Sequence, residues 1–150
     1  MIDAPNAGRF EGRAHLLPIR VYYEDTDFTG LVYHANYVRY FERGRSDFLR
    51  MVGVSHADLL IGDSPSAFVI TRMEIDFRRP ARIDDALLVH TTYDRVKGPR
   101  LFITQHVTCD GALIAEAVVE AACITLDGRP RKPAPGLVER LRPWFAPTAP

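Results

Sequence analysis

The stretch Tyr22–Arg45, YYEDTDFTGLVYHANYVRYFERGR, changes character halfway along its length. Its first half places three carboxylates, Glu24, Asp25 and Asp27, just ahead of a glycine. Its second half opens a run in which apolar residues recur at the spacing of an amphipathic helix. The stretch therefore predicts an acidic turn that leads directly into a helix.

This helix is predicted to run from about His34 to Val52, with Gly53 placed to cap its C-terminus. The stripe that faces the core consists of Tyr37, Phe41, Gly44, Phe48 and Val52. A glycine within a helix costs about 1 kcal/mol relative to alanine. Gly44 is explained if the helix approaches a sheet closely at that point, although a tolerated glycine fits the same pattern.

The segments around this helix alternate between apolar and polar residues, as strands do. A strand is expected at Leu17–Tyr23 and, after a short helical turn capped by Ser55, further strands start at Phe68 or run over Ala86–Val96, Leu101–Cys109 and Leu113–Leu126. In the strand that starts at Phe68, we expect Val69, Thr71, Met73, Ile75 and Phe77 to share one face. Short turns such as Asp110-Gly111 require antiparallel neighbours. The pattern predicts an α+β fold with one long helix against a curled antiparallel sheet.

Length and composition indicate one domain of 150 residues. We expect a flexible arm at residues 1–14, the domain at 15–128, and a proline-rich extension with a short helix at 129–150. Nineteen basic and nineteen acidic side chains cancel, so no general affinity for nucleic acid is expected. No apolar run approaches the ~18 residues that span a bilayer, and the N-terminus lacks the apolar segment of a signal peptide, which predicts a cytoplasmic protein. Cys109 and Cys123 are expected as small buried residues in strands, without a metal.

Three interpretations of the acidic turn can be compared. An EF-hand calcium loop would need a glutamate at its twelfth position, which is Asn36, and a helix in front, so we reject it. In a purely structural turn, Asp25 would satisfy backbone N–H groups and offset the helix dipole. In a catalytic turn, Asp27 would lie beside the free N–H groups of the helix start, which can hold an oxyanion.

The catalytic interpretation indicates hydrolysis of an activated acyl group. The chain has no G-x-S-x-G nucleophile elbow and no cysteine beside this turn. Asp27 would therefore act either as the nucleophile or as the general base on a water molecule. Spacing alone does not choose between these two roles.

Residues Ile19–Leu49 resemble the signature of the hotdog-fold acyl-CoA thioesterases of the 4-hydroxybenzoyl-CoA thioesterase family. The likeness lies in the motif D-x-D-x-x-G-x-V-Y-H-x-x-Y, followed by Y-x-E-x-x-R. The segments FVITRMEIDFRRPARIDD and K-G-P-R-L-F are also similar to the Tol-Pal-associated, short- to medium-chain branch of that family. The resemblance covers roughly Ile19 to Leu126.

The resemblance implies a long central helix wrapped by a five-stranded antiparallel sheet. It also implies a thioester hydrolase without a cofactor, since coenzyme A is part of the substrate and product. Two subunits would pair their sheets edge to edge, and two such homodimers would form a tetramer. Acyl carrier protein is a possible further partner.

The family's catalytic aspartate matches Asp27, and the backbone N–H that polarises the thioester carbonyl matches His34. By the same resemblance, Gly30 would keep the loop open for the ligand, and Tyr33 would lie beside the carbonyl. His34 stands where the members that act on aromatic substrates carry a tyrosine, which favours aliphatic substrates. The His34 side chain could also orient water or bind the thioester, or simply cap the helix.

Coenzyme A carries phosphates, so basic groups are expected near the mouth of its binding site. The candidates are Arg78, Arg79, Arg82, Lys97 and Arg100, with Arg129, Arg131 and Lys132 as weaker ones. A hotdog fold also occurs in dehydratases and in proteins without catalysis. The dehydratase motif is not found, but a role in binding acyl carrier protein or in scaffolding phospholipid-synthesis enzymes stays open.

Overall fold

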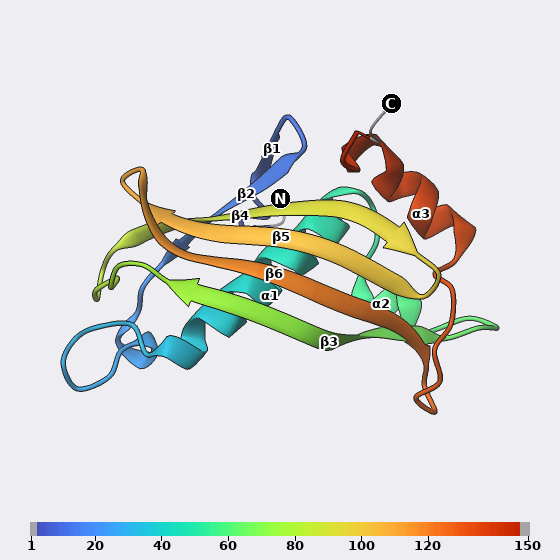
Figure 1. Cartoon of the computed structure of the whole chain (residues 1–150), viewed down its shortest axis with the longest axis horizontal. Helices are drawn as coiled ribbons and strands as arrows, with labels where there is room; N and C mark the ends of the chain where they lie inside the picture. Colours follow the sequence, from blue (N-terminus) through green and yellow to red (C-terminus); the bar gives the residue numbers. More distant parts are fainter. Residues whose placement is uncertain (1–2, 148–150) are drawn as a thin grey trace.

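A computed structural model describes residues 3–147, in which one antiparallel sheet curls around one long helix (Figure 1). The helix is α1 (His34–Met51). The strands are β1 (Arg9–Glu11), β2 (Ala14–Arg20), β3 (Ser66–Phe77), β4 (Ala86–Lys97), β5 (Arg100–Cys109) and β6 (Ala112–Thr125). The shorter helical elements are η1 (Tyr23–Asp25), α2 (His56–Leu59), α3 (Pro135–Leu141) and η2 (Arg142–Trp144).

The strands lie in the order β1-β2-β4-β5-β6-β3, and all neighbours are antiparallel. The predicted α+β class is confirmed, but the expected count of five strands is wrong, because the sheet has six. The additional strand is β1, within the segment expected to be a flexible arm. It is held by Phe10, whose ring packs 5.0 Å from that of Phe48 and 4.7 Å from that of Trp144. Residues 1–2 and 148–150 of the expected arm and extension lie outside the described residues.

The core forms where α1 crosses the concave face of the sheet. Tyr40, Phe41 and Phe48 of the helix are fully buried there. A Cβ atom at Gly44 would lie 2.7 Å from Thr91 Oγ1 and 2.8 Å from a methyl carbon of Val89. The close approach expected at this glycine is therefore confirmed.

Strand β3 contains an irregularity that the alternation of its residues does not reveal. Its pairing with β6 shifts in register between Ile70 and Arg72. Phe68 and Ile70 pair with Cys123 and Ala121, on the same face of β6 as the partners of Met73, Ile75 and Phe77. The expectation that Val69 shares the face of Met73 is wrong, because the bulge reverses the alternation between them. Thr71 lies in the bulge and has no register partner in β6.

Two peripheral features complete the fold. Leu137 and Leu141 of α3 are buried against the core, so the C-terminal segment packs on the domain. Strand β3 lies at one edge of the sheet and offers an unpaired edge of 12 residues.

Within residues 3–147, no helix combines the length and hydropathy needed to cross a membrane. Cys109 and Cys123 are both free thiols in strands; Cys123 is buried as expected, whereas Cys109 is only half-buried.

Candidate active site

The acidic turn lies at the N-terminal end of α1, far from α3 (Figure 1). Asp25 is buried, and its carboxylate accepts the N–H of Tyr22 at 2.8 Å. Its carbonyl oxygen accepts the N–H of Tyr33 at 2.9 Å and the side-chain amide of Asn36 at 2.7 Å. These bonds tie η1 to the start of the helix, so Asp25 shapes the loop. Asn36 was not predicted; its only signal in the sequence is a polar residue beside the apolar stripe.

Asp27 points the other way and is exposed. Its Oδ1 atom accepts the hydroxyl of Thr29 at 2.5 Å and the backbone N–H of Thr29 at 2.8 Å. The hydroxyl of Thr29, followed by its N–H, holds the pKa of Asp27 below its usual value. Asp27 is therefore ionised at neutral pH, as either a nucleophile or a general base must be.

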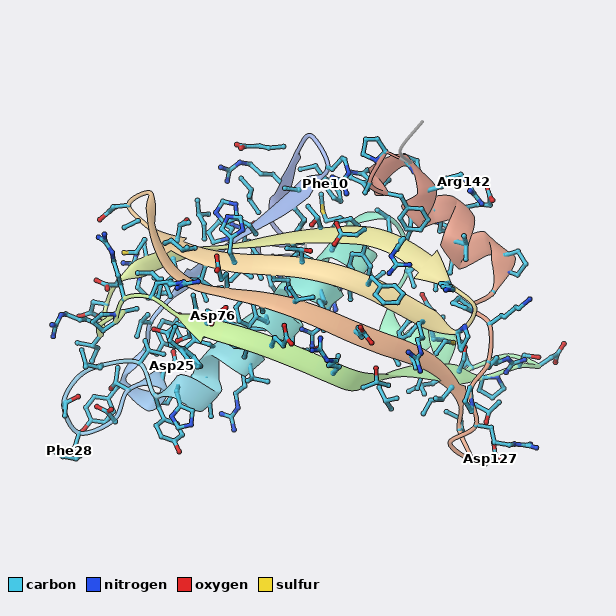
Figure 2. All side chains as sticks on the ribbon, viewed as in Figure 1. Phe10, Asp25, Phe28, Asp76, Asp127 and Arg142 are labelled. Atoms are coloured by element: carbon cyan, nitrogen blue, oxygen red, sulfur yellow. The ribbon has the colours of Figure 1, made fainter. Side chains whose placement is uncertain are left out.

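Gly30 closes the loop that carries Asp27. Its φ of +82° lies in the region that favours glycine, and its N–H donates to the Asp27 carbonyl at 3.1 Å. A Cβ atom at this position would meet nothing within 4 Å. A side chain would have room here, so it is the positive φ of the backbone that explains the glycine. Figure 2 shows Phe28 at the outer tip of the same loop, while Asp25 lies inward.

The start of α1 provides the second chemical element of the site. Tyr33 is the N-cap residue, but its side chain makes no capping bond. Among the described residues, no acceptor is found for the backbone N–H of His34. The N-terminus of an 18-residue helix thus presents a free donor and a positive partial charge.

Both elements face one cleft of about 430 Å³. Its walls are Asp27, Leu31, Val32, Tyr33, His34, Tyr37, Phe77, Arg78, Arg79 and Pro80. The ring of His34 lies 4.5 Å from that of Tyr33 and 6.4 Å from that of Phe77. In such an apolar cleft, a carboxylate can attack an acyl carbonyl, and the helix N-terminus can hold the oxyanion that forms.

The predicted basic residues divide between two places. Arg78 and Arg79 line the cleft, and Arg78 already pairs with Glu116 at 2.7 Å. Arg79 makes no ion pair with any described residue. Arg82 pairs its backbone with Leu31 but does not line the cleft.

Lys97 and Arg100 lie at the other end of the sheet, in the β4–β5 hairpin. Arg100 is in register with Ala122, which pairs with Val69, and Phe77 beside the cleft is roughly 26 Å further along β3. One chain therefore does not bring this hairpin to the cleft. There the two side chains line a hollow of about 510 Å³.

The remaining cations follow β6. Arg129 pairs with Asp127 at 3.0 Å, and Arg131 donates to the carbonyl of Pro65 at 3.3 Å. Lys132 lines a third hollow against α3. Residues 3–147 hold no group of three or more His, Cys, Asp or Glu side chains arranged for a metal ion.

Comparisons with known proteins agree with this geometry. The model of the thioesterase-like superfamily matches residues 21–145. The chain is 39% identical over 109 residues to the acyl-CoA thioesterase YbgC of Haemophilus influenzae, covering 73% of this chain and 79% of that one. It is 41% identical over 108 residues to the acyl-CoA thioester hydrolase YbgC of Escherichia coli, covering 71% and 79%.

Solved structures give the same result. The crystal structure of a probable thioesterase from Bartonella henselae superposes with a TM-score of 0.78 at 42% identity, covering 81% of this chain and 99% of that chain. The family match extends over more than four fifths of the sequence and includes both the acidic loop and α1. The predicted family is thereby confirmed, and this chain belongs to the thioesterase-like superfamily of hotdog-fold thioester hydrolases.

Proposed function

We propose that this protein hydrolyses short- to medium-chain aliphatic acyl-CoA to the free acid and coenzyme A. One observation carries the proposal: the ionised carboxylate of Asp27 and the unpartnered N-terminus of α1 face the same cleft. The two curated relatives are named as an acyl-CoA thioesterase and an acyl-CoA thioester hydrolase, which supports this substrate class.

In the proposed mechanism, the thioester carbonyl oxygen accepts a hydrogen bond from the backbone N–H of His34. Asp27 then either attacks the carbonyl carbon or removes a proton from the water that attacks it. The C–S bond breaks and coenzyme A leaves as the thiolate, which takes up a proton. In the nucleophilic route, attack by Asp27 forms an acyl-aspartyl anhydride, and one water molecule then hydrolyses it to the free acid and regenerates Asp27. Both routes need the ionised carboxylate that Thr29 favours.

The acyl chain is proposed to lie along the apolar wall of the cleft. Leu31, Val32 and Phe77 supply this wall, and Tyr33 would stand beside the carbonyl. His34 in place of a tyrosine favours aliphatic over aromatic acyl groups. Each methylene group of an aliphatic chain that is buried in the cleft favours binding by about 0.8 kcal/mol.

Dimerisation through β3 is part of the proposal. An unpaired 12-residue edge invites pairing with a second strand, and a second copy offers one of equal length. Arg72 and Glu74 lie two residues apart on the same face of β3. A two-fold axis near Met73 would set Arg72 opposite Glu74 of the partner subunit, an attractive pair at both related positions.

Such a dimer accounts for the divided basic residues. Antiparallel pairing places the Phe77 end of one β3 beside the Ser66 end of the other. The hairpin with Lys97 and Arg100 belongs to the Ser66 end, so it would approach the partner's cleft. We propose that these two residues, together with Arg79 at the cleft, hold the phosphates of coenzyme A.

A second candidate function is the binding of acyl carrier protein, with hydrolysis secondary. The hollow lined by Arg95, Lys97 and Arg100 favours it, because three cations suit an acidic protein surface. Co-purification with acyl carrier protein, performed beside the hydrolysis assay, separates the two candidates. Binding with no measurable hydrolysis would favour the second.

The decisive experiment measures release of free thiol from a panel of acyl-CoA esters. Asp27→Asn keeps the shape of the side chain but removes its charge, so turnover should fall by at least ~100-fold. Glu24→Gln is the matched control, an exposed carboxylate of the same turn that does not line the cleft. Near-normal turnover by Asp27→Asn would refute the assignment.

A further inference from the structure

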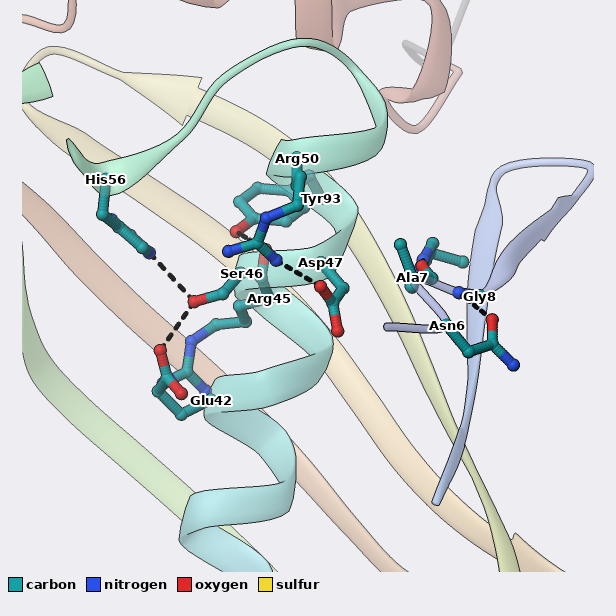
Figure 3. A network of polar contacts seen from close by, with 11 residues as sticks. Asn6, Ala7, Gly8, Glu42, Arg45, Ser46, Asp47, Arg50, His56 and Tyr93 are labelled. Carbon is teal, nitrogen blue, oxygen red and sulfur yellow. Dashed lines mark hydrogen bonds and ion pairs between the residues drawn. The ribbon is translucent and has the colours of Figure 1, made fainter. Parts of the chain in front are cut away.

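A three-membered polar chain lies on the surface of α1, away from the cleft of its own subunit. The Ser46 hydroxyl lies 2.6 Å from Oε1 of Glu42 and 2.9 Å from Nε2 of His56 (Figure 3). A carboxylate only accepts, so the single proton of Ser46 points to Glu42. His56 must then donate its Nε2–H to Ser46, and this bond orients the ring. Its other nitrogen, Nδ1, has no partner among the described residues.

The position of His56 mirrors that of His34. The ring of His56 lies 6.3 Å from that of Phe68 near the start of β3, and the ring of His34 lies 6.4 Å from that of Phe77 at its end. Both phenylalanines face the helix side of the sheet, because both pair with inward-facing residues of β6. Each chain thus carries one histidine–phenylalanine pair at either end of its free edge.

We infer that His56 of one subunit contacts the pantetheine arm of the acyl-CoA bound in the cleft of the partner. The inference rests on the proposed function and on pairing through β3. Antiparallel pairing brings the Phe68 end of one strand beside the Phe77 end of the other. His56 then lies at the mouth of the partner's cleft, on the same face of the joined sheet, although it is far from Asp27 of its own chain.

The chemistry of the arm suits an oriented imidazole. Pantetheine carries two amide groups, and the unprotonated Nδ1 atom of His56 can accept a hydrogen bond from an amide N–H. Stability gives little reason for the polar chain, because His56 is exposed and surface contacts of this kind contribute little. A ring held in one orientation loses less entropy when it binds a ligand.

The first test replaces His56 by alanine and measures acyl-CoA hydrolysis. One lost hydrogen bond predicts a KM raised about three- to tenfold, with kcat within about twofold, because the contact is made equally in substrate and transition state. Asp63→Ala, an exposed residue of the loop after α2, is the matched control. An unchanged KM in His56→Ala would overturn the inference.

The second test uses mixed dimers, purified through two different tags, with Asp27→Asn in one chain and His56→Ala in the other. If His56 acts across the interface, the only active cleft sees an intact His56. The mixed dimer then shows the wild-type KM and about half the wild-type kcat. A KM equal to that of the His56→Ala homodimer would overturn the inference. The failure of the proposed function is separate, and would appear as an active Asp27→Asn homodimer.

Discussion

At the residue scale, His90 and His106 form an unusual pair on the outer face of the sheet. They are directly opposed across β4 and β5, with ring centroids 4.0 Å apart and planes 13° apart. Burial, and then the neighbouring His106, lower the pKa of His90 to about 4. Glu11 opposes this shift and Arg9 adds to it. Burial also lowers the pKa of His106, against the attraction of Glu116.

This pair predicts a loss of stability in acid. An unfolded histidine titrates near 6.5, so the unfolded chain binds protons that the folded pair rejects. The contribution of the pair to the free energy of unfolding should be complete above about pH 6.5 and should be lost progressively as the pH falls toward 4. His90→Gln should reduce this fall by on the order of 1 kcal/mol, allowing for partial exposure. Urea unfolding at pH 7.5 and 5.0 measures it; equal falls in variant and wild type would contradict the assignment.

Single residues also show where prediction from sequence stops. The motif D-T-D identified two candidate acids; the catalytic interpretation of the turn used Asp27, and the family resemblance agreed with that choice. The physical difference between them is the direction of the side chain: Asp25 turns inward to the N–H of Tyr22, and Asp27 turns outward to Thr29. That direction depends on the loop between η1 and α1, which no local periodicity encodes.

At the element scale, the contact between α1 and the sheet depends on Gly44. Gly44→Ala should destabilise the protein by roughly 1–3 kcal/mol, because the new methyl group meets Thr91 and Val89 at less than 3 Å. Gly136→Ala is the matched control, since α3 leaves open space at that position. It should be neutral or stabilising by up to about 1 kcal/mol. Chemical unfolding measures both, and similar effects of the two changes would contradict the close approach.

Most elements could be predicted because their periodicity is strong. The helix expected at His34–Val52 is observed at His34–Met51, and Cys109 faces Ala112 in the antiparallel pair that the Asp110-Gly111 turn predicted. The bulge in β3 could not be predicted, because it depends on pairing with β6. Strand β1 was missed because it has only three residues, too few to show a period, and its Phe10 packs on Trp144, far along the chain.

At the scale of the whole molecule, the sequence predicted antiparallel neighbours but not their order. Alternation shows which face a residue occupies, whereas the neighbour of a strand is decided by the packing of the entire sheet. The family resemblance supplied the architecture, and the structure adds that β3 is left at the edge. The residues proposed to bind coenzyme A could not be placed together, because Arg79 and Lys97 lie at opposite ends of the sheet within one subunit.

The edge position of β3 predicts a homodimer, and two such dimers would form the expected tetramer. Light scattering at micromolar concentration should give at least twice the mass of one 16.9 kDa chain. Arg72→Glu should weaken the dimer, because it would set two glutamates opposite each other across the axis. Lys132→Glu is the charge-matched control outside this edge. An active monomer would contradict the proposal.

The strand order has a consequence for synthesis on the ribosome. Strand β2 ends at residue 20, but its neighbour β4 begins only at residue 86. At 5–20 residues per second, the growing chain waits roughly 3–13 s for that neighbour to be translated. From the completion of α1 at Met51 until β4 and the later strands are translated, the aromatic face of the helix lacks most of the sheet that covers it. The nascent chain is then a natural client for chaperones that shield apolar surface until translation has supplied the missing strands.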